Sequence, residues 1–238
     1  MAALLLTGSV PTMAQTDDFG LWSEVNVEKK LSKKWSLDAG LEYRNRDNMK
    51  TADRWSLGVD VNYKLTDWLK LSAGYSLLDD HYYKLNDSGK KYADYWGPRH
   101  RFNVSLTFDK KLIGDFRFSL RERWQYTYRP SQNVTRWSFF DNAYESEAHE
   151  YSGKGKNVLR SRLQIEYDKK GLAITPYANV ELFNAWNVQK IRYNVGVDWK
   201  LSKQHSLGLF YRYQHVYDDD DDLEPNIHML GLSYKFKF

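Results

Sequence analysis

The last nine residues of the chain, 230–238, alternate strictly between two kinds of side chain. Gly, Ser and Lys occupy every second position, and the positions between them hold Leu230, Leu232, Tyr234, Phe236 and Phe238. Because successive side chains of a β-strand point to opposite faces, one face of this segment is apolar and the other is small or charged. Such a strand suits a wall between lipid and water, and a chain that repeats it has few alternatives to a membrane-spanning β-barrel.

The same period of two residues recurs along most of the chain. A helix would repeat its apolar residues every three or four positions, and these segments do not. The alternation predicts strands over residues 19–31, 35–46, 55–65, 69–77, 102–108, 116–128, 159–167, 174–182, 191–201, 207–213 and 230–238.

Roughly eleven strands can be read in this way, whereas bacterial single-chain barrels have an even number. We therefore expect an all-β, up-and-down antiparallel transmembrane β-barrel of about twelve strands, with ten as the alternative. Twelve strands require one more strand in a long loop or near residue 15. Ten require that the segment from Phe19 lies outside the wall.

Short turns alternate with longer polar loops, as in barrels with periplasmic turns and extracellular loops. One turn design is predicted to recur in three similar segments, which are Leu31–Trp35, Leu65–Trp68 and Leu201–His205. Long loops are expected over 79–98 and 129–157, and an acidic loop over 218–224. If the 129–157 loop enters the lumen, the pore is closed.

The composition narrows the class of protein. A mean hydropathy of -0.72, 28% charged residues and the lack of a long apolar run exclude a helical membrane protein. The 18 Tyr and 9 Trp fit the aromatic girdles of a barrel. The net charge of +4 without a basic run excludes a nucleic-acid partner, and the absence of Cys excludes disulfides and thiolate metal sites.

The first residues are typical of a secretory signal. An apolar stretch leads to a small-residue site, which predicts that residues 1–14 are removed after Ala14 and that 15–238 form the barrel. The basic region that opens such a signal is missing, so we expect the natural chain to start further upstream.

Short motifs resemble those of the domain of unknown function 2490 family of bacterial outer-membrane β-barrel proteins, common in Bacteroidetes. These are the Asp-Phe-x-Leu-Trp start at 18–22, the turn at 31–37, Leu-Glu-Tyr-Arg at 41–44 and the Tyr-Lys-Phe-Lys-Phe end. The resemblance covers essentially the mature chain. It implies a barrel in the outer membrane of a Gram-negative cell, in contact with lipid and lipopolysaccharide, and it implies no activity.

The end of the chain is similar to the C-terminal signal that outer-membrane barrels present to the barrel-assembly machinery. Its residues are Tyr234, Phe236 and Phe238. We expect Phe238 to matter for insertion in cells more than for stability once folded.

The face of the strands that should line the lumen is rich in arginine. Arginine stays charged and presents a fixed fork of donors that matches carboxylates and phosphates. Rows of it in a lumen would concentrate and guide anions. The candidate lumen arginines are Arg44, Arg54, Arg101, Arg117, Arg121, Arg123, Arg160, Arg162, Arg192 and Arg212.

Carboxylates share the same inward face and could cancel this field through salt bridges. They include Glu24, Glu28, Asp38, Glu42, Asp60, Glu166, Glu181 and Asp198. Two functions therefore compete: a small, porin-like passive channel with a weak preference for anionic solutes, and a closed structural barrel whose extracellular loops bind partners. We expect partial pairing and a residual positive stripe near the Arg117–Arg123 strand.

Catalytic chemistry has little support in the sequence. None of the six His lies in the spacing of a catalytic or zinc motif, and the run Asp218–Asp222 lacks the spaced ligands and turn Gly of a calcium loop. We expect no metal, no cofactor and no enzymatic activity, with an outer-membrane hydrolase as a distant third reading.

Overall fold

The computed structural model describes residues 17–138, 146–217 and 226–238. Every regular element in these residues is a strand, as the period of two predicts, and no helix among them is long and apolar enough to cross a membrane. The strands are β1 (Asp18–Lys30), β2 (Trp35–Arg46), β3 (Thr51–Lys64), β4 (Leu69–Leu85), β5 (Lys91–Ile113), β6 (Phe116–Arg129), β7 (Gln132–Ser138), β8 (Ser146–Tyr151), β9 (Lys154–Tyr167), β10 (Ile174–Ala185), β11 (Asn187–Lys200), β12 (His205–Val216) and β13 (Ile227–Lys237).

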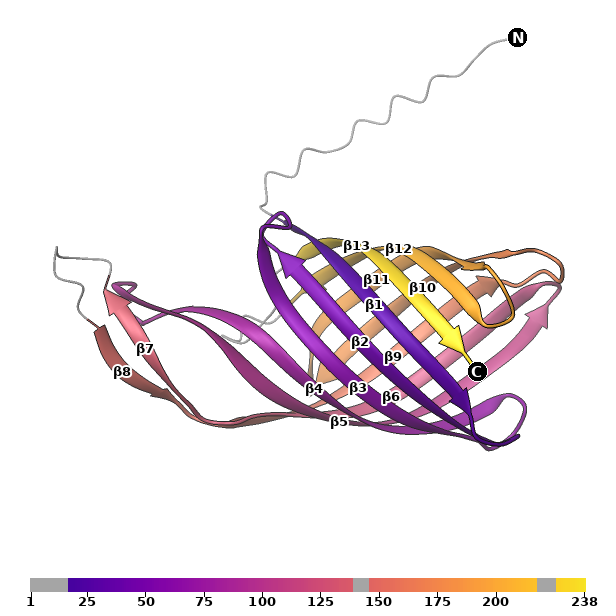
Figure 1. Cartoon of the computed structure of the whole chain (residues 1–238), viewed down its shortest axis with the longest axis horizontal. Coiled ribbons are helices and arrows are strands. Elements are labelled where there is room, and N and C mark those ends of the chain that lie inside the picture. The colour runs from indigo at the N-terminus through magenta and orange to yellow at the C-terminus, as the bar shows by residue number, and fades with distance from the viewer. Residues whose placement is uncertain (1–16, 139–145, 218–225) are drawn as a thin grey trace, which may run out of the picture.

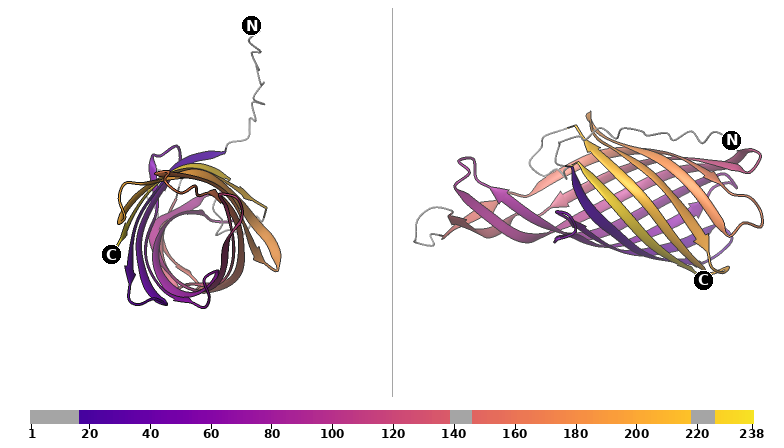
Figure 2. Two further views of the ribbon diagram at one scale, coloured as in Figure 1. Left: turned by 90° about the vertical axis from the view of Figure 1, so that its right-hand side faces the viewer. Right: turned by 90° about the horizontal axis from the view of Figure 1, so that it is seen from above.

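Within the described residues, eleven of these strands close into a barrel (Figures 1 and 2). The order runs from β4 back through β3, β2 and β1 to β13, continues through β12, β11, β10, β9 and β6 to β5, and β5 then pairs with β4. The predicted all-β, membrane-type barrel is thus confirmed. The expected count of twelve, with ten as the alternative, is wrong: the segment from Phe19 is a wall strand and the number is odd.

The odd number is possible because β1 and β13 pair in parallel, while the other pairs of wall strands are antiparallel. We call this β1–β13 junction the seam. It runs in register from Asp18 opposite Ile227 to Glu28 opposite Lys237. At its end the N–H of Phe238 donates to the carbonyl of Glu28 at 2.9 Å. An even count is required only when the closing pair is also antiparallel.

The two ends of the barrel differ. At the turn end, where the C-terminus lies, short turns join the strands (Figure 1). The three similar turn phrases share one hydrogen-bond pattern: the N–H groups of Leu31, Leu65 and Leu201 each donate across the turn at 3.0 Å. The hydroxyl of Ser32, Thr66 or Ser202 accepts a backbone N–H inside its turn. A side chain that mimics a turn acceptor in this way favours the tight connection.

At the opposite end, which we call the hairpin end, an arm projects beyond the barrel (Figures 1 and 2). The outer parts of β4 and β5 and the β7–β8 hairpin form it, and β7 pairs with β5 through Lys91 and Tyr92. The loops expected over 79–98 and 129–157 are therefore wrong for most of their length. Polar and Tyr side chains occupy both faces there, because strands beyond a lipid band meet water on both sides.

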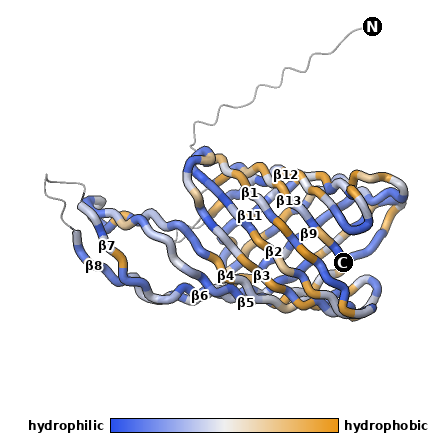
Figure 3. The backbone as a smooth tube through the Cα atoms, in the orientation of Figure 1, coloured by the Kyte–Doolittle hydropathy of each residue, from blue (hydrophilic) through white to orange (hydrophobic). Residues whose placement is uncertain are grey.

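Hydrophobic and hydrophilic residues alternate along the strands (Figure 3), and the exposed apolar side chains form rows on the outer face of the barrel. Exposed aliphatic side chains such as Leu57, Leu163 and Leu209 lie between two belts of aromatic pairs. Near the turn end, Trp35 packs on Tyr63 with ring centroids 4.6 Å apart. Near the hairpin end, Tyr43 packs on Trp55 at 4.4 Å. An apolar band between two aromatic girdles is the outer surface of a transmembrane barrel.

Candidate functional site

The lumen holds two adjoining cavities. The first, of about 510 Å³, lies toward the hairpin end, and the second, of about 500 Å³, lies toward the turn end. We call the first the vestibule. Fourteen lysines and arginines line it against five carboxylates, which are Glu24, Asp38, Glu42, Asp60 and Glu181. No residue of β7 or β8 lines either cavity, so these two strands do not fill the lumen.

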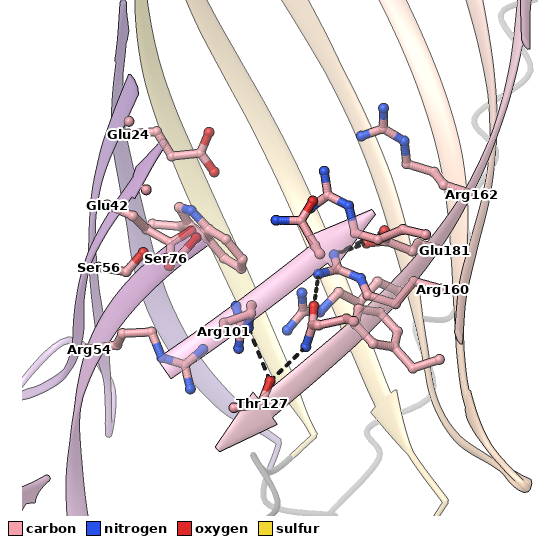
Figure 4. A pocket seen from close by; sticks show the side chains of 18 of the residues that line it. Glu24, Glu42, Arg54, Ser56, Ser76, Arg101, Thr127, Arg160, Arg162 and Glu181 are labelled. Carbon is pink, nitrogen blue, oxygen red and sulfur yellow. Dashed lines mark hydrogen bonds and ion pairs between the residues drawn. The ribbon is translucent and has the colours of Figure 1, made fainter. Parts of the chain in front are cut away.

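Small residues on β2, β3 and β4 make room for the vestibule. Gly40 and Gly58 face each other across β2 and β3, and Ser56 and Ser76 lie beside them. In Figure 4 these serines lie on one side of the pocket with Glu24 and Glu42, opposite Arg160, Arg162 and Glu181. The small residues, Glu24 and Glu42 thus share one side of the vestibule with Arg54, and Arg160 and Arg162 lie on the other side with Glu181.

The arginine wall is built from two cross-strand pairs on β6 and β9. Arg123 lies opposite Arg160, and Arg121 lies opposite Arg162. Like charges directly opposite one another destabilise a sheet unless other groups compensate them. Glu181 on β10 supplies part of the compensation: it pairs with Arg121 and accepts from Arg160 Nη2 at 2.9 and 3.0 Å. Glu181 thus pairs with two of the four guanidinium groups, and Arg123 and Arg162 form no ion pair with it.

Four predicted lumen arginines make no ion pair within 4.0 Å in the described part of the chain. Arg123 donates only to the hydroxyl of Ser105 at 2.7 Å, and Arg101 to that of Thr127 at 3.4 Å. Arg212 donates to the side-chain carbonyl of Asn194, and its Nη1 is buried without a partner. Arg162 Nε is likewise unpartnered. These guanidinium groups retain N–H groups from which an anion could accept a hydrogen bond.

Trp22 of β1 organises the part of the vestibule near the seam. Its side chain is 4% exposed, and the guanidinium carbons of Arg44 and Arg212 lie 3.3 and 3.7 Å from its ring centroid. Phe210 meets the same ring edge-on at 6.5 Å. Cations over an indole face are attracted to its negative quadrupole, so Trp22 helps to hold these two arginines close together.

The remaining predicted arginines are tied to local partners. Arg44 pairs with Glu42 at 2.7 Å, Arg54 with Asp80, and Arg192 donates to Gln214 Oε1 at 2.7 Å. Arg117 lines only the second cavity.

Arg117 pairs with Asp109 and lies 3.9 Å from Asp168, which follows β9 in the turn beyond it. Burial raises the pKa of Asp168, but the hydrogen bond and the charge of Lys200 outweigh it and lower that pKa overall. The positive stripe expected at Arg117–Arg123 is therefore split. Arg117 is compensated at the turn end, and Arg123 is not.

Several vestibule residues were not predicted from the sequence. The unpredicted cations are Arg99, Arg129, Lys154, Lys156 and Lys190. They fell within the expected loops or just beyond the expected strand ends, where no apolar row marks the register. Extending the alternation of β5 by one step, from Arg101 to Arg99, would have found the first of them. The signal peptide expected at 1–14 and the acidic loop expected at 218–224 lie outside the described residues.

The C-terminal aromatic residues lie on the outer face at the turn end. Tyr234 hydrogen-bonds to His205 Nδ1 at 2.6 Å, and Phe236 stacks on Phe238 at 5.4 Å. Among the other histidines, His228 contacts Asp17 at 3.2 Å and Tyr211. No group of three or more potential metal ligands occurs in the described ranges.

The fold and the lumen define the class: a β-barrel of the outer-membrane type. Among solved structures, the chain is similar to the translocator domain of the autotransporter NalP from Neisseria meningitidis, with 10% identity, 83% of this chain and 79% of that chain covered, and a TM-score of 0.60. It is also similar to the β domain of the Bordetella autotransporter BrkA, with 16% identity, 85% and 81% covered, and a TM-score of 0.51.

The family of the chain is assigned by its sequence and not by its fold. Residues 19–224 match the family described as protein of unknown function (DUF2490), and the chain belongs to it. This confirms the family inferred from the short motifs. No curated protein matches the chain.

Proposed function

We propose that this protein is an outer-membrane barrel that admits small anionic solutes from the cell exterior through its vestibule, as a passive channel with weak anion preference. The observation that carries the proposal is the charge of the vestibule, fourteen cations against five carboxylates, with four arginines that form no ion pair in the described residues. A lumen lined by one sign of charge raises the local concentration of the opposite ion.

The orientation follows from the two ends of the barrel. Short turns and the C-terminus face the periplasm in outer-membrane barrels, and longer connections face the exterior. The turn end is then periplasmic, and the arm and the vestibule open to the outside. The girdles and the aliphatic band support this placement in the outer membrane, with lipid and lipopolysaccharide around the wall.

Binding of an external partner is a second candidate, because the arm is stiffened rather than loose. Tyr82 stacks on Tyr95 at 5.2 Å, and Tyr95 stacks on Tyr151 at 5.6 Å, which ties the β7–β8 hairpin to β4 and β5. A stiffened arm beyond the membrane suits partner recognition. Neither candidate involves catalysis, and we propose no enzymatic activity.

Planar-bilayer recording of the purified, refolded protein tests the proposal. In a KCl gradient we expect steady conductance, with a reversal potential displaced toward the chloride equilibrium potential. A variant without residues 130–153, of which none that the structure describes lines either cavity, should conduct equally and serves as the control for the arm. A barrel that inserts but never conducts would reject the channel and favour the partner-binding candidate.

A further inference from the structure

The two lumen cavities share five lining residues, and all five are charged. They are Asp38, Asp60, Arg121, Arg123 and Arg162. Every other lining residue belongs to only one of the cavities. A solute that moves from the vestibule to the turn end must therefore pass this layer. We call it the charged layer.

Its two signs of charge are separated onto different walls. Asp38 and Asp60 lie directly opposite one another on β2 and β3. Arg121 and Arg162 form the corresponding pair on β6 and β9, with Arg123 one step along β6. In the order of the barrel, β4 and β5 separate the two walls on one side, and β10 to β13 and β1 separate them on the other. The acidic and basic pairs thus face each other across the lumen.

The facing charges do not neutralise each other by contact. No ion pair within 4.0 Å joins either aspartate to any of the three arginines in the described ranges, although all five side chains are only partly buried. Asp38 accepts from Asn62 at 2.9 Å, and the Oδ1 atoms of Asp38 and Asp60 are left without a hydrogen bond. Within each wall the charges have the same sign and would repel one another strongly without solvation. The layer therefore needs water or a solute between its walls.

The carboxylate of Asp60 is accommodated by a glycine on the next strand. A Cβ on Gly74 would lie 2.0 Å from Asp60 Oδ1, so any larger residue on β4 would displace the carboxylate. The glycine therefore allows the carboxylate to occupy this layer.

We propose that the charged layer is the selectivity filter of the barrel, with a transverse electric field between Asp38 and Asp60 on one wall and Arg123 and Arg162 on the other. Small carboxylate or phosphate solutes follow the arginine wall and are opposed by the aspartates, which keeps the anion preference weak. This inference rests on the proposed channel function. It adds the residues that set the ion preference.

The test uses two double variants of the full-length protein in planar bilayers, with KCl gradients and then potassium acetate and potassium phosphate. Asp38→Asn with Asp60→Asn should raise the anion-to-cation permeability ratio by about threefold, and Arg123→Gln with Arg162→Gln should lower it by about threefold, as expected for unit charges several ångströms from the ion path in water. Arg46→Gln is the matched control, because Arg46 pairs with Asp53 outside both cavities.

The outcomes separate the filter from the channel. Opposite shifts of the reversal potential in the two variants support the filter. Conductance with the wild-type reversal potential in both variants overturns the filter and leaves the channel intact, whereas no conductance from the wild type overturns both. If a double variant fails to insert, Asp60→Asn and Arg123→Gln alone replace it, each with a smaller shift of the same sign; an unchanged reversal potential in both also overturns the filter.

Discussion

At the scale of single residues, Glu181 has a larger role than its isolated place in the sequence indicates. It is the only carboxylate within 4.0 Å of the β6–β9 arginine wall among the described lumen residues, and its side chain is 7% exposed. Removing one member of a buried ion pair leaves the other charge uncompensated, which is more costly than the pair itself is favourable.

Glu181→Gln is therefore expected to destabilise the barrel by about 3 kcal/mol, because Arg121 and Arg160 would lose their shared counter-charge. The measurement is the urea concentration at which the folded, heat-modifiable gel band disappears. Glu24→Gln is the matched control, since Glu24 lines the same vestibule but forms no ion pair within 4.0 Å in the described chain. Equal midpoints for the two variants would contradict the role of Glu181.

At the scale of elements, the β7–β8 hairpin is docked by the Tyr82–Tyr95–Tyr151 stack together with a few backbone and polar contacts. Two residue pairs join β7 to β5, and Lys91 of β5 donates to Glu147 of β8 at 2.6 Å. The hydrogen bond from Lys91 and its charge, aided by Arg136, hold the pKa of Glu147 below its usual range. A lowered folded pKa stabilises the docked hairpin above the unfolded pKa, and the stabilisation is lost as the pH falls through the folded value.

We therefore expect the hairpin to loosen in acid, below the ordinary glutamate pKa of about 4.3, while the wall stays folded. Amide hydrogen exchange of β7 and β8, compared at pH 6 and about two pH units lower, measures this loosening. Glu147→Gln should remove the acid dependence, and Glu150→Gln on the same strand should keep it. Acid-independent exchange in the wild type would show that other contacts hold the hairpin.

The end of β13 combines two roles that a substitution can separate. The backbone of Phe238 takes part in the seam: its N–H donates to Glu28, and its carbonyl accepts from Lys30 at 3.0 Å. The side chain is 52% exposed on the outer face. Deleting the residue therefore removes hydrogen bonds as well as the ring, whereas Phe238→Ala removes only the ring.

We expect Phe238→Ala to reduce insertion into the outer membrane in cells while leaving refolding into detergent nearly unchanged. Deletion should also lower stability, by about 1 kcal/mol for each lost hydrogen bond. Cell fractionation and urea titration measure the two effects. Wild-type levels of the Phe238→Ala variant in the outer membrane would show that the ring contributes to the aromatic girdle and not to insertion.

At the scale of the whole molecule, the parallel seam decides how the barrel closes. Leu21 of β1 lies opposite Leu230 of β13, and Tyr211 of β12 lies opposite Leu230 on its other side. Paired strands place such residues within disulfide reach, while a residue two strands away is about 10 Å distant. The chain has no Cys of its own, so engineered pairs report on the seam without interference.

Leu21→Cys with Leu230→Cys should form a disulfide on mild oxidation, and Leu21→Cys with Tyr211→Cys should not. A shift in gel mobility that reducing agent reverses detects the bond. If a twelfth strand lay between β1 and β13, the first pair would fail to cross-link, and the eleven-strand wall would be wrong.

The period of two residues was sufficient to predict the class of fold, most of the strands, the shared turn design and the side on which each arginine lies, because side-chain direction along a strand is a local property. Those features needed no knowledge of partner strands. The family could also be inferred from short motifs. The arm was missed because its strands meet water on both faces and carry no apolar row.

The parallel seam, the odd strand number and the pairing of particular charges depend on the stagger between strands that are distant in sequence. Trp22 meets Arg212 only because β1 closes on β13, and Glu181 reaches Arg121 only because β6 pairs with β9 across the β7–β8 hairpin. Residue spacing along one strand carries no information on such contacts. Only the tertiary structure therefore shows which arginines are compensated and which remain open to an anion.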